Sequence, residues 1–127
     1  MTSVEVPYSI AAALPSLAVL DITEDVAQQV AAADVASGVA YVSAPPGCLV
    51  RVNERETGFF CDIEDLLTRL VPLGSYRRER MLSLLLGPRT EQVPFVDGRL
   101  ATGQWQRILL FDVNGGCRGE WTLTLVG

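Results

Sequence analysis

Three carboxylates lie close together near the middle of the chain and are the first candidates for chemistry. They are Glu54, Glu56 and Asp62. Two carboxyl groups in unlike environments can divide the roles of general acid and general base, and such oxygen ligands can also hold a hard cation such as Mg²⁺. The alternative is structural, because Glu54 and Glu56 can form ion pairs with Arg51 and Arg55 on a solvated turn. The spacing alone does not choose between these two interpretations.

All ten cationic side chains are arginine, because the sequence contains neither lysine nor histidine. This composition excludes a Schiff-base lysine, a phosphate-loop lysine, a histidine general base and a histidine-ligated metal. The planar guanidinium suits phosphate and carboxylate, so several arginines could converge on one anion. The candidates are Arg51, Arg80, Arg99, Arg107 and Arg118. The simpler alternative is that Arg99 and Arg107 are exposed.

Trp105 and Gln106 follow Gly103 at the start of an expected strand. The indole N–H and the amide could hydrogen-bond a ligand at the mouth of a pocket. The alternative is a tryptophan that anchors the sheet at a turn.

The three cysteines, Cys48, Cys61 and Cys117, are an odd number and contain no Cys-x-x-Cys pair. They predict neither a disulfide framework nor a zinc site, and Cys48 lacks a histidine that could activate it as a nucleophile. We expect reduced thiols that pack as small core residues, in a cytoplasmic protein without metal or cofactor.

The chain has 127 residues and a net charge of −5, which fits one domain over residues 1–127. No cluster of basic residues is longer than Arg77–Arg78, so the charge argues against a nucleic-acid partner or an anionic membrane. No segment reaches the ~18 apolar residues of a membrane span, and the first residues lack the basic region of a signal peptide.

Helices that could position these side chains follow from hydrophobic periodicity. Thr23 is the expected N-cap of an amphipathic helix over Glu24–Val35. A second helix is predicted by apolar residues at helical spacing, namely Phe59, Ile63, Leu66, Leu67 and Leu70. A third is expected over Arg77–Leu86, before Gly87 and Pro88.

The remaining periodic segments predict strands. They are Val4–Ala13, Gly38–Ser43, Cys48–Asn53, Glu91–Val96, Arg99–Ala101, Gln106–Val113 and Gly119–Val126, with a further apolar run over Ser16–Ile22. Asp97-Gly98 and Asn114-Gly115 are tight-turn signals between strands. Trp121, Leu123 and Leu125 share one face of the last strand, which predicts a sheet with one buried face. Strands and helices without regular βαβ alternation indicate an α+β fold.

The strand that begins at Cys48 has two different faces. Alternation places Cys48, Val50 and Val52 on one face, and Leu49 and Arg51 on the other. We therefore expect Arg51 to project away from the two valines.

The stretch Val93–Gln106 carries a pattern that identifies a candidate family. Pro94, Gly98, Leu100, Gly103, Trp105 and Gln106 occupy the fixed positions of Pro-x-x-x-Gly-x-Leu-x-x-Gly-x-Trp-Gln. This pattern resembles the signature of the YjbQ-like (UPF0047) family, which usually has threonine where this chain has Gln104. Further matches in the same order are Asp21–Val26, Val52-Asn53-Glu54, Asp62, Leu70-Val71-Pro72 and Arg118. The resemblance spans about Leu20 to Gly127.

The resemblance implies an α+β β-sandwich with two to three helices that assembles as a homotrimer. It also implies pockets near the subunit interfaces and a secondary thiamine-phosphate synthase activity. The site residues that it implies are Asn53, Glu54, Asp62, Trp105, Gln106 and Arg118.

The chain departs from the family where the family carries histidines. Pro45-Pro46-Gly47-Cys48 stands where the family has His-Thr-Thr followed by Ala or Cys, and Arg80 stands where a histidine is expected. The first hypothesis is a divergent enzyme that works with carboxylates alone, with Glu54 and Asp62 as the catalytic pair. The second is a non-catalytic trimeric protein that binds a small anionic or phosphorylated ligand through Arg80 and Arg118.

Overall fold

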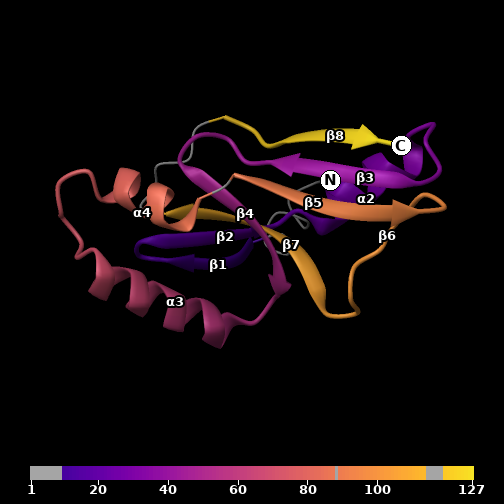
Figure 1. Ribbon diagram of the computed structural model, residues 1–127. Helices are drawn as coiled ribbons and strands as arrows, with labels where there is room; N and C mark the ends of the chain where they lie inside the picture. The colour runs from indigo at the N-terminus through magenta and orange to yellow at the C-terminus, as the bar shows by residue number, and fades with distance from the viewer. Residues whose placement is uncertain (1–9, 88, 114–118) are drawn as a thin grey trace, which may run out of the picture.

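The computed structural model describes residues 10–87, 89–113 and 119–127 and contains two antiparallel four-stranded sheets (Figure 1). Sheet A has the strand order β1 (Ile10–Leu14), β2 (Leu17–Asp21), β7 (Gln106–Val113) and β4 (Cys48–Glu54). Sheet B has the order β6 (Arg99–Leu100), β5 (Thr90–Val96), β3 (Gly38–Ser43) and β8 (Thr122–Val126). The helices are α2 (Thr23–Ala32), α3 (Thr57–Leu70) and α4 (Arg78–Leu86). The α+β β-sandwich predicted from the sequence is confirmed.

The first hydrophobic core lies between the two sheets and is closed by α2. It contains Ala40 and Val42 of β3, Val93 and Phe95 of β5, Cys48 and Val50 of β4, Ile108 and Leu110 of β7, and Ile22, Val26 and Val30. The alternation predicted for β4 is confirmed, since Val52 packs against the same core. The predicted face of β8 is also confirmed, because Trp121, Leu123 and Leu125 pack there.

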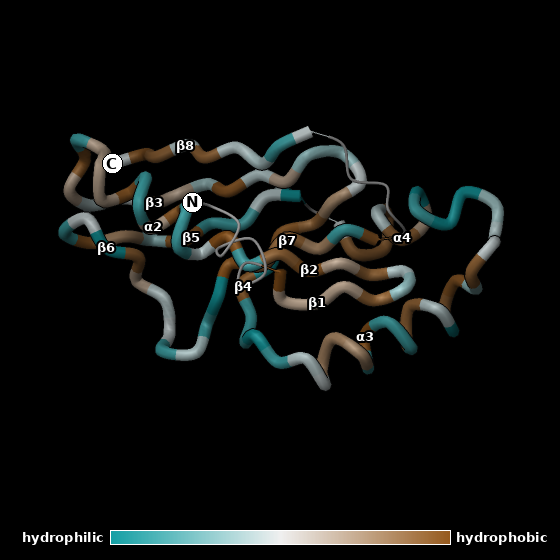
Figure 2. The backbone as a smooth tube through the Cα atoms, turned by 180° about the vertical axis from the view of Figure 1, so that it is seen from behind, coloured by the Kyte–Doolittle hydropathy of each residue, from teal (hydrophilic) through white to brown (hydrophobic). Residues whose placement is uncertain are grey.

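The second core lies on the outer face of sheet A, where α3 and α4 cover it (Figure 1). Its main side chains are Leu17, Val19, Leu109 and Val113 of the sheet, Phe60 and Leu67 of α3, and Leu82 of α4. β7 is therefore buried on both faces, and Figure 2 shows its largely apolar character. No described helix is long and apolar enough to span a bilayer.

Several sequence predictions need correction. Thr23 is the first residue of α2 and not its cap, because its hydroxyl donates to the Asp21 carboxylate and accepts from the Ile108 backbone N–H. The face predicted for α3 is wrong in part. The helix buries Phe60 and Leu67 but leaves Phe59 40% and Leu66 45% exposed.

The hairpin Asp97-Gly98 joins β5 to β6 with positive φ at both residues, as predicted. The second turn signal, Asn114-Gly115, lies outside the described residues. The strands that flank it do not form a hairpin, because β7 pairs with β2 and β4 whereas β8 pairs with β3. Residues 4–9 of the first expected strand also lie outside the description, and β1 begins at Ile10.

The prediction that all thiols are reduced and buried is wrong. Cys48 is buried and disulfide-bonded, and Cys61 is a free thiol that is exposed.

A buried ion cluster joins three elements at one end of sheet A. The Asp21 carboxylate is 2% exposed and accepts hydrogen bonds from Arg107 Nε at 2.8 Å and Arg55 Nη1 at 3.2 Å. Thr23 donates to it through its N–H and its hydroxyl, and Arg107 also contacts Glu24 at 3.0 Å. Burial alone would raise the pKa of Asp21, but the hydrogen bonds from Arg107 and Thr23 outweigh this effect and lower the pKa below 3.8.

We predict that Asp21→Asn lowers the free energy of unfolding at pH 7 by about 3 kcal/mol, because it removes the buried carboxylate that Arg55 and Arg107 share and leaves Arg107 with Glu24 alone. The pKa of Asp21 is lower in the folded state than in the unfolded state, so its contribution is complete above the unfolded value. The contribution is lost as the pH falls through the folded value, and the difference between variant and wild type should shrink there. Urea unfolding from pH 7 to pH 2 measures both effects.

The control is Asp25→Asn, since Asp25 is exposed on α2, next to Glu24 of the cluster. It should change the free energy of unfolding by less than about 0.5 kcal/mol. Equal effects of the two substitutions would contradict a stabilising role for the cluster.

Candidate functional site

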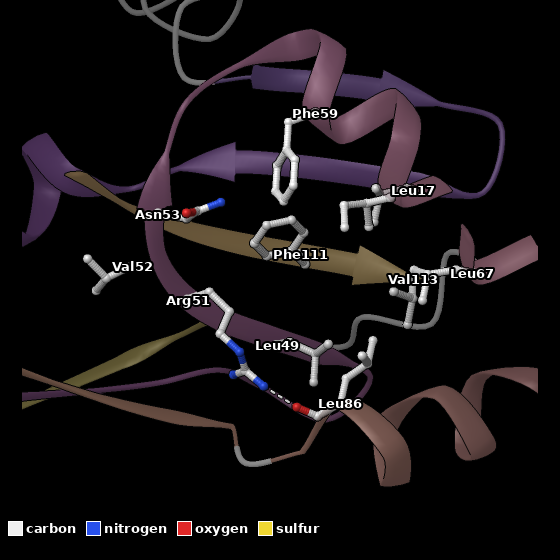
Figure 3. Close-up of a pocket in the computed structure, with 11 residues that line it drawn as sticks. Leu17, Leu49, Arg51, Val52, Asn53, Phe59, Leu67, Leu86, Phe111 and Val113 are labelled. Carbon is white, nitrogen blue, oxygen red and sulfur yellow. Dashed lines mark hydrogen bonds between the residues drawn. The ribbon is translucent and has the colours of Figure 1, made fainter. Parts of the chain in front are cut away.

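A pocket of about 320 Å³ lies between the outer face of sheet A and helices α3 and α4 (Figure 3). Its apolar lining comes from Leu17, Leu49, Val52, Phe59, Ile63, Leu67, Leu86, Phe111 and Val113. Its polar lining comes from Arg51 and Asn53, two successive outward positions of β4. The Phe111 ring meets Phe60 edge to face, with centroids 6.0 Å apart, and so fixes the sheet wall against α3.

Arg51 is held in the pocket wall by main-chain carbonyl groups. Its guanidinium donates to the carbonyl of Leu86, to that of Gly87 at 2.6 Å and to that of Val50 at 2.8 Å (Figure 3). Leu86 and Gly87 lie at the C-terminal end of α4, where carbonyl groups carry partial negative charge and lack helical donors. The same side chain therefore attaches α4 to β4 and brings a permanent positive charge to an apolar pocket.

A smaller hollow of about 170 Å³ adjoins this pocket and is lined by Asn53, Glu54, Glu56 and Phe59. Asn53 and Phe59 line both cavities, so the carboxylates lie beside the opening of the apolar pocket. Glu56 has a structural role as well, because its carboxylate caps α3 by accepting from the Phe59 N–H at 3.2 Å.

The expected ion pairs between these glutamates and their neighbouring arginines are not found among the described contacts. Arg55 contacts the Asp21 carboxylate, and Arg51 donates to the carbonyl groups at the end of α4. The structural alternative considered for Glu54 and Glu56 is therefore wrong in its choice of partners.

The register of sheet A brings part of the predicted site together. Glu54 faces Gln106 across the β4–β7 ladder, and Asn53 faces Arg107. The Gln106 amide oxygen accepts from the Gly103 N–H at 2.8 Å, so it closes a local turn. Trp105 is 69% exposed, which excludes the alternative that it anchors the sheet.

Two other predicted site residues, Asp62 and Arg80, lie apart from this group. Asp62 is exposed on α3 and Arg80 is exposed on α4, and neither lines the two cavities described above. Arg118 lies outside the described residues. The structure therefore brings Asn53, Glu54 and Gln106 together, but the predicted Asp62 is not part of this group.

Sequence reasoning missed two features of this region. Arg107 was expected to be either part of an anion site or exposed, whereas it is bound by Asp21 and Glu24. Arg51 was only one of five candidate arginines. The alternation of Leu49, Arg51 and Asn53 was the available signal, because it predicts one shared face for all three residues.

Comparison with known proteins gives the same fold throughout. Residues 13–127 match the family described as UPF0047 protein YjbQ-like. A UPF0047 protein of Archaeoglobus fulgidus is 36% identical, and the match covers 76% of this chain and 82% of that protein. Among solved structures, a YjbQ/UPF0047 family protein of Clostridium acetobutylicum has a TM-score of 0.77 at 23% identity, covering 90% of this chain and 95% of that one. A hypothetical protein of Aeropyrum pernix K1 has a TM-score of 0.75 at 29% identity, covering 87% and 90%. The signature around Gly103, Trp105 and Gln106, the shared fold and the family match agree, and this chain belongs to the YjbQ-like (UPF0047) family.

Proposed function

We propose that this protein binds a small molecule with an apolar body and one anionic group in the pocket between sheet A, α3 and α4. The observation that carries this proposal is the Arg51 guanidinium in a wall that is otherwise apolar, apart from Asn53. A volume of about 320 Å³ is at the lower end for small-molecule sites, and a few polar groups in an apolar lining are typical of them. The apolar lining would bind the body of the ligand, and Arg51 and Asn53 would bind its anionic group.

Arg51 takes the place that sequence reasoning gave to Arg80 and Arg118. Arg80 is exposed on α4, outside the lining of the pocket. Two further guanidinium groups, those of Arg55 and Arg107, are neutralised by the Asp21 carboxylate and are therefore weaker candidates for an anion.

Under this proposal the protein lacks the histidine-dependent activity that the family resemblance implies, since the chain has no histidine. A second candidate is a thiamine-phosphate synthase-like enzyme that uses carboxylates alone. The hollow that Asn53, Glu54 and Glu56 share favours it, because carboxylates beside a pocket can transfer protons. Asp62 lies outside this hollow, so Glu56 is the structurally better partner for Glu54.

The first test uses two fluorescent probes that differ by a single charged group. Anilinonaphthalene sulfonate carries the anion, and N-phenylnaphthylamine is the same body without it. We predict that Arg51→Gln weakens binding of the sulfonate about ten-fold more than binding of the neutral probe. Both probes lose the support of the bonds that attach α4 to β4, but only the sulfonate also loses the charge-assisted contact. Fluorescence titration measures both affinities.

Arg80→Gln is the matched control and should leave both affinities within about two-fold of the wild type. Leu49→Phe fills the pocket and should weaken both probes alike. Equal loss of both probes in Arg51→Gln would show that Arg51 supports the pocket without contacting the anionic group. No loss in Leu49→Phe would show that the probes bind elsewhere.

We also predict that the protein does not turn over thiamine precursors to thiamine phosphate, because it lacks the neutral-pH proton-transfer groups of histidine. A product assay by chromatography checks this expectation. Turnover that disappears in Glu54→Gln, and persists in the exposed control Asp62→Asn, would establish the carboxylate enzyme instead.

The assembly that we propose is a homotrimer, as the family resemblance implies. Exposed apolar side chains on α3 and α4 support it, because large exposed apolar patches usually mark an interaction surface. Light scattering at micromolar concentration should give a mass near three chains. A monomer under these conditions would contradict the trimer but not the ligand site, which lies within one chain.

A further inference from the structure

The C-terminal end of α4 is attached to β4 by the Arg51 side chain. Nη2 of Arg51 donates to the Leu86 carbonyl and also to the Gly87 carbonyl, so both N–H groups of this nitrogen are occupied (Figure 3). Nη1 donates to the Val50 carbonyl within β4. Leu86 itself lines the pocket, so the end of α4 is part of the pocket wall. The two bonds from Nη2 therefore hold this wall in place.

The proposed anionic group and the end of α4 need the same donors of Arg51. A guanidinium binds a carboxylate, sulfonate or phosphate most strongly through two parallel N–H groups on different nitrogens. Either such pair includes one N–H of Nη2, because the pairs are Nε with Nη2 and Nη1 with Nη2. An anion bound in this way must therefore displace the carbonyl of Leu86 or that of Gly87.

Few apolar contacts keep α4 docked once these bonds are lost. Among the 9 residues of α4, Leu82 is the one apolar side chain that is fully buried, and Leu86 is partly buried in the same core. Met81, Leu84 and Leu85 are exposed. Isolated helices shorter than about 12–15 residues are marginal in water. An undocked α4 should therefore lose its helical hydrogen bonds, and its amide protons should exchange with solvent.

The N-terminal end of α4 makes the docked position unfavourable. Arg78 is 2% exposed and its Nε donates to the Val71 carbonyl at 2.7 Å, but its buried Nη1 and Nη2 find no acceptor in the described part of the chain. Buried donors without acceptors are destabilising. Arg77, which precedes the helix, has a φ of 60°, a left-handed conformation that is unfavourable for residues other than glycine. The bonds from Arg51 at the other end of α4 oppose both effects.

We propose that α4 is a lid on the pocket, which Arg51 holds closed and an anionic ligand releases. The anion takes Nη2 of Arg51 from the carbonyl groups, the C-terminal end of α4 undocks, and the pocket opens on the side that Leu86 lines. The inference rests on the proposed ligand site and assigns its regulation. Binding and opening are linked, so a change that stabilises the docked helix must weaken binding of the anion by the same factor.

Hydrogen exchange followed by mass spectrometry measures the opening of α4 in the full chain. Saturating anilinonaphthalene sulfonate should accelerate exchange of the α4 amides about five-fold, whereas a ligand that does not open the helix protects it or leaves its exchange unchanged. The neutral N-phenylnaphthylamine should cause no acceleration, because it does not compete for Nη2 of Arg51. The amides of α2 are the internal reference and should exchange at the same rate with and without either probe.

Arg51→Gln removes the bonds to α4 in the absence of a ligand. Exchange of the α4 amides should then be about ten-fold faster, and the sulfonate should cause no further acceleration. Arg51→Lys keeps the charge but loses the paired N–H groups, so it should change exchange in the same direction and replaces Arg51→Gln if that variant does not fold. Arg69→Gln is the matched control, because Arg69 also donates to a main-chain carbonyl, that of Asp65 within α3. It should leave exchange of α4 unchanged.

Arg77→Gly tests the linkage from the opposite end of the helix. Glycine adopts the left-handed conformation without the Cβ penalty, so α4 should dock more firmly. Exchange of the α4 amides should slow about five-fold, and affinity for the sulfonate should fall by the same factor. Arg77→Ala removes the same charge but keeps the penalty, so it should resemble the wild type in both measurements.

Binding of the sulfonate with unchanged or slower exchange of α4 would overturn the lid and leave the ligand site intact. Absence of sulfonate binding would overturn both. Equal acceleration by the neutral probe would contradict competition for Arg51 and overturn the lid as proposed here. Acceleration in α2 as large as that in α4 would show a general loosening of the fold and overturn it too.

Discussion

The burial of sheet A on both faces is the constraint on which the remaining structure depends. Along β7, Ile108 and Leu110 pack between the sheets, while Leu109 and Val113 face the opposite layer. Each such side chain contributes about 1.5–3 kcal/mol when it is removed from water, so neither face can be left open. Helices α3 and α4 cover the outer face of sheet A. The layer that they form is thin, because Phe60, Leu67 and Leu82 are the only apolar side chains that these helices bury, and the space that remains is the pocket.

The two ends of sheet A are organised differently. At the end of β2, the Asp21 carboxylate neutralises Arg55 and Arg107 and connects β2, β7 and the residue after β4. On the outer face, Arg51 interacts with carbonyl groups at the end of α4, so the charge of its guanidinium lies next to a partial negative charge and an apolar wall. Arginine suits both sites, because its planar guanidinium can donate hydrogen bonds to several acceptors at once. A chain without lysine and histidine thus uses one residue type for a structural cluster and for the candidate ligand contact.

The elements of the fold could largely be predicted from the sequence, because periodicity is a local property. β7 was predicted with its observed bounds, and the two faces of β4 followed from alternation. Pairing between distant strands could not be predicted. The turn signal at Asn114-Gly115 suggested that its flanking strands are neighbours, yet β7 and β8 belong to different sheets. Which side of α3 is buried also depended on the shape of the sheet beneath it, and not on helical spacing alone.

The candidate site was predicted only where the family signature and the register of β4 and β7 coincide, at Asn53, Glu54 and Gln106. The pocket itself is formed by side chains from five elements that are far apart in sequence, so no local pattern could reveal it. The most direct measurement is a set of intermolecular nuclear Overhauser effects between anilinonaphthalene sulfonate and the methyl groups of the protein. We predict contacts from the naphthyl ring to Leu17, Leu67 and Val113, which line the pocket. Contacts confined to Leu84 and Leu85, which are exposed on α4, would place the probe outside the pocket and contradict the proposed ligand site.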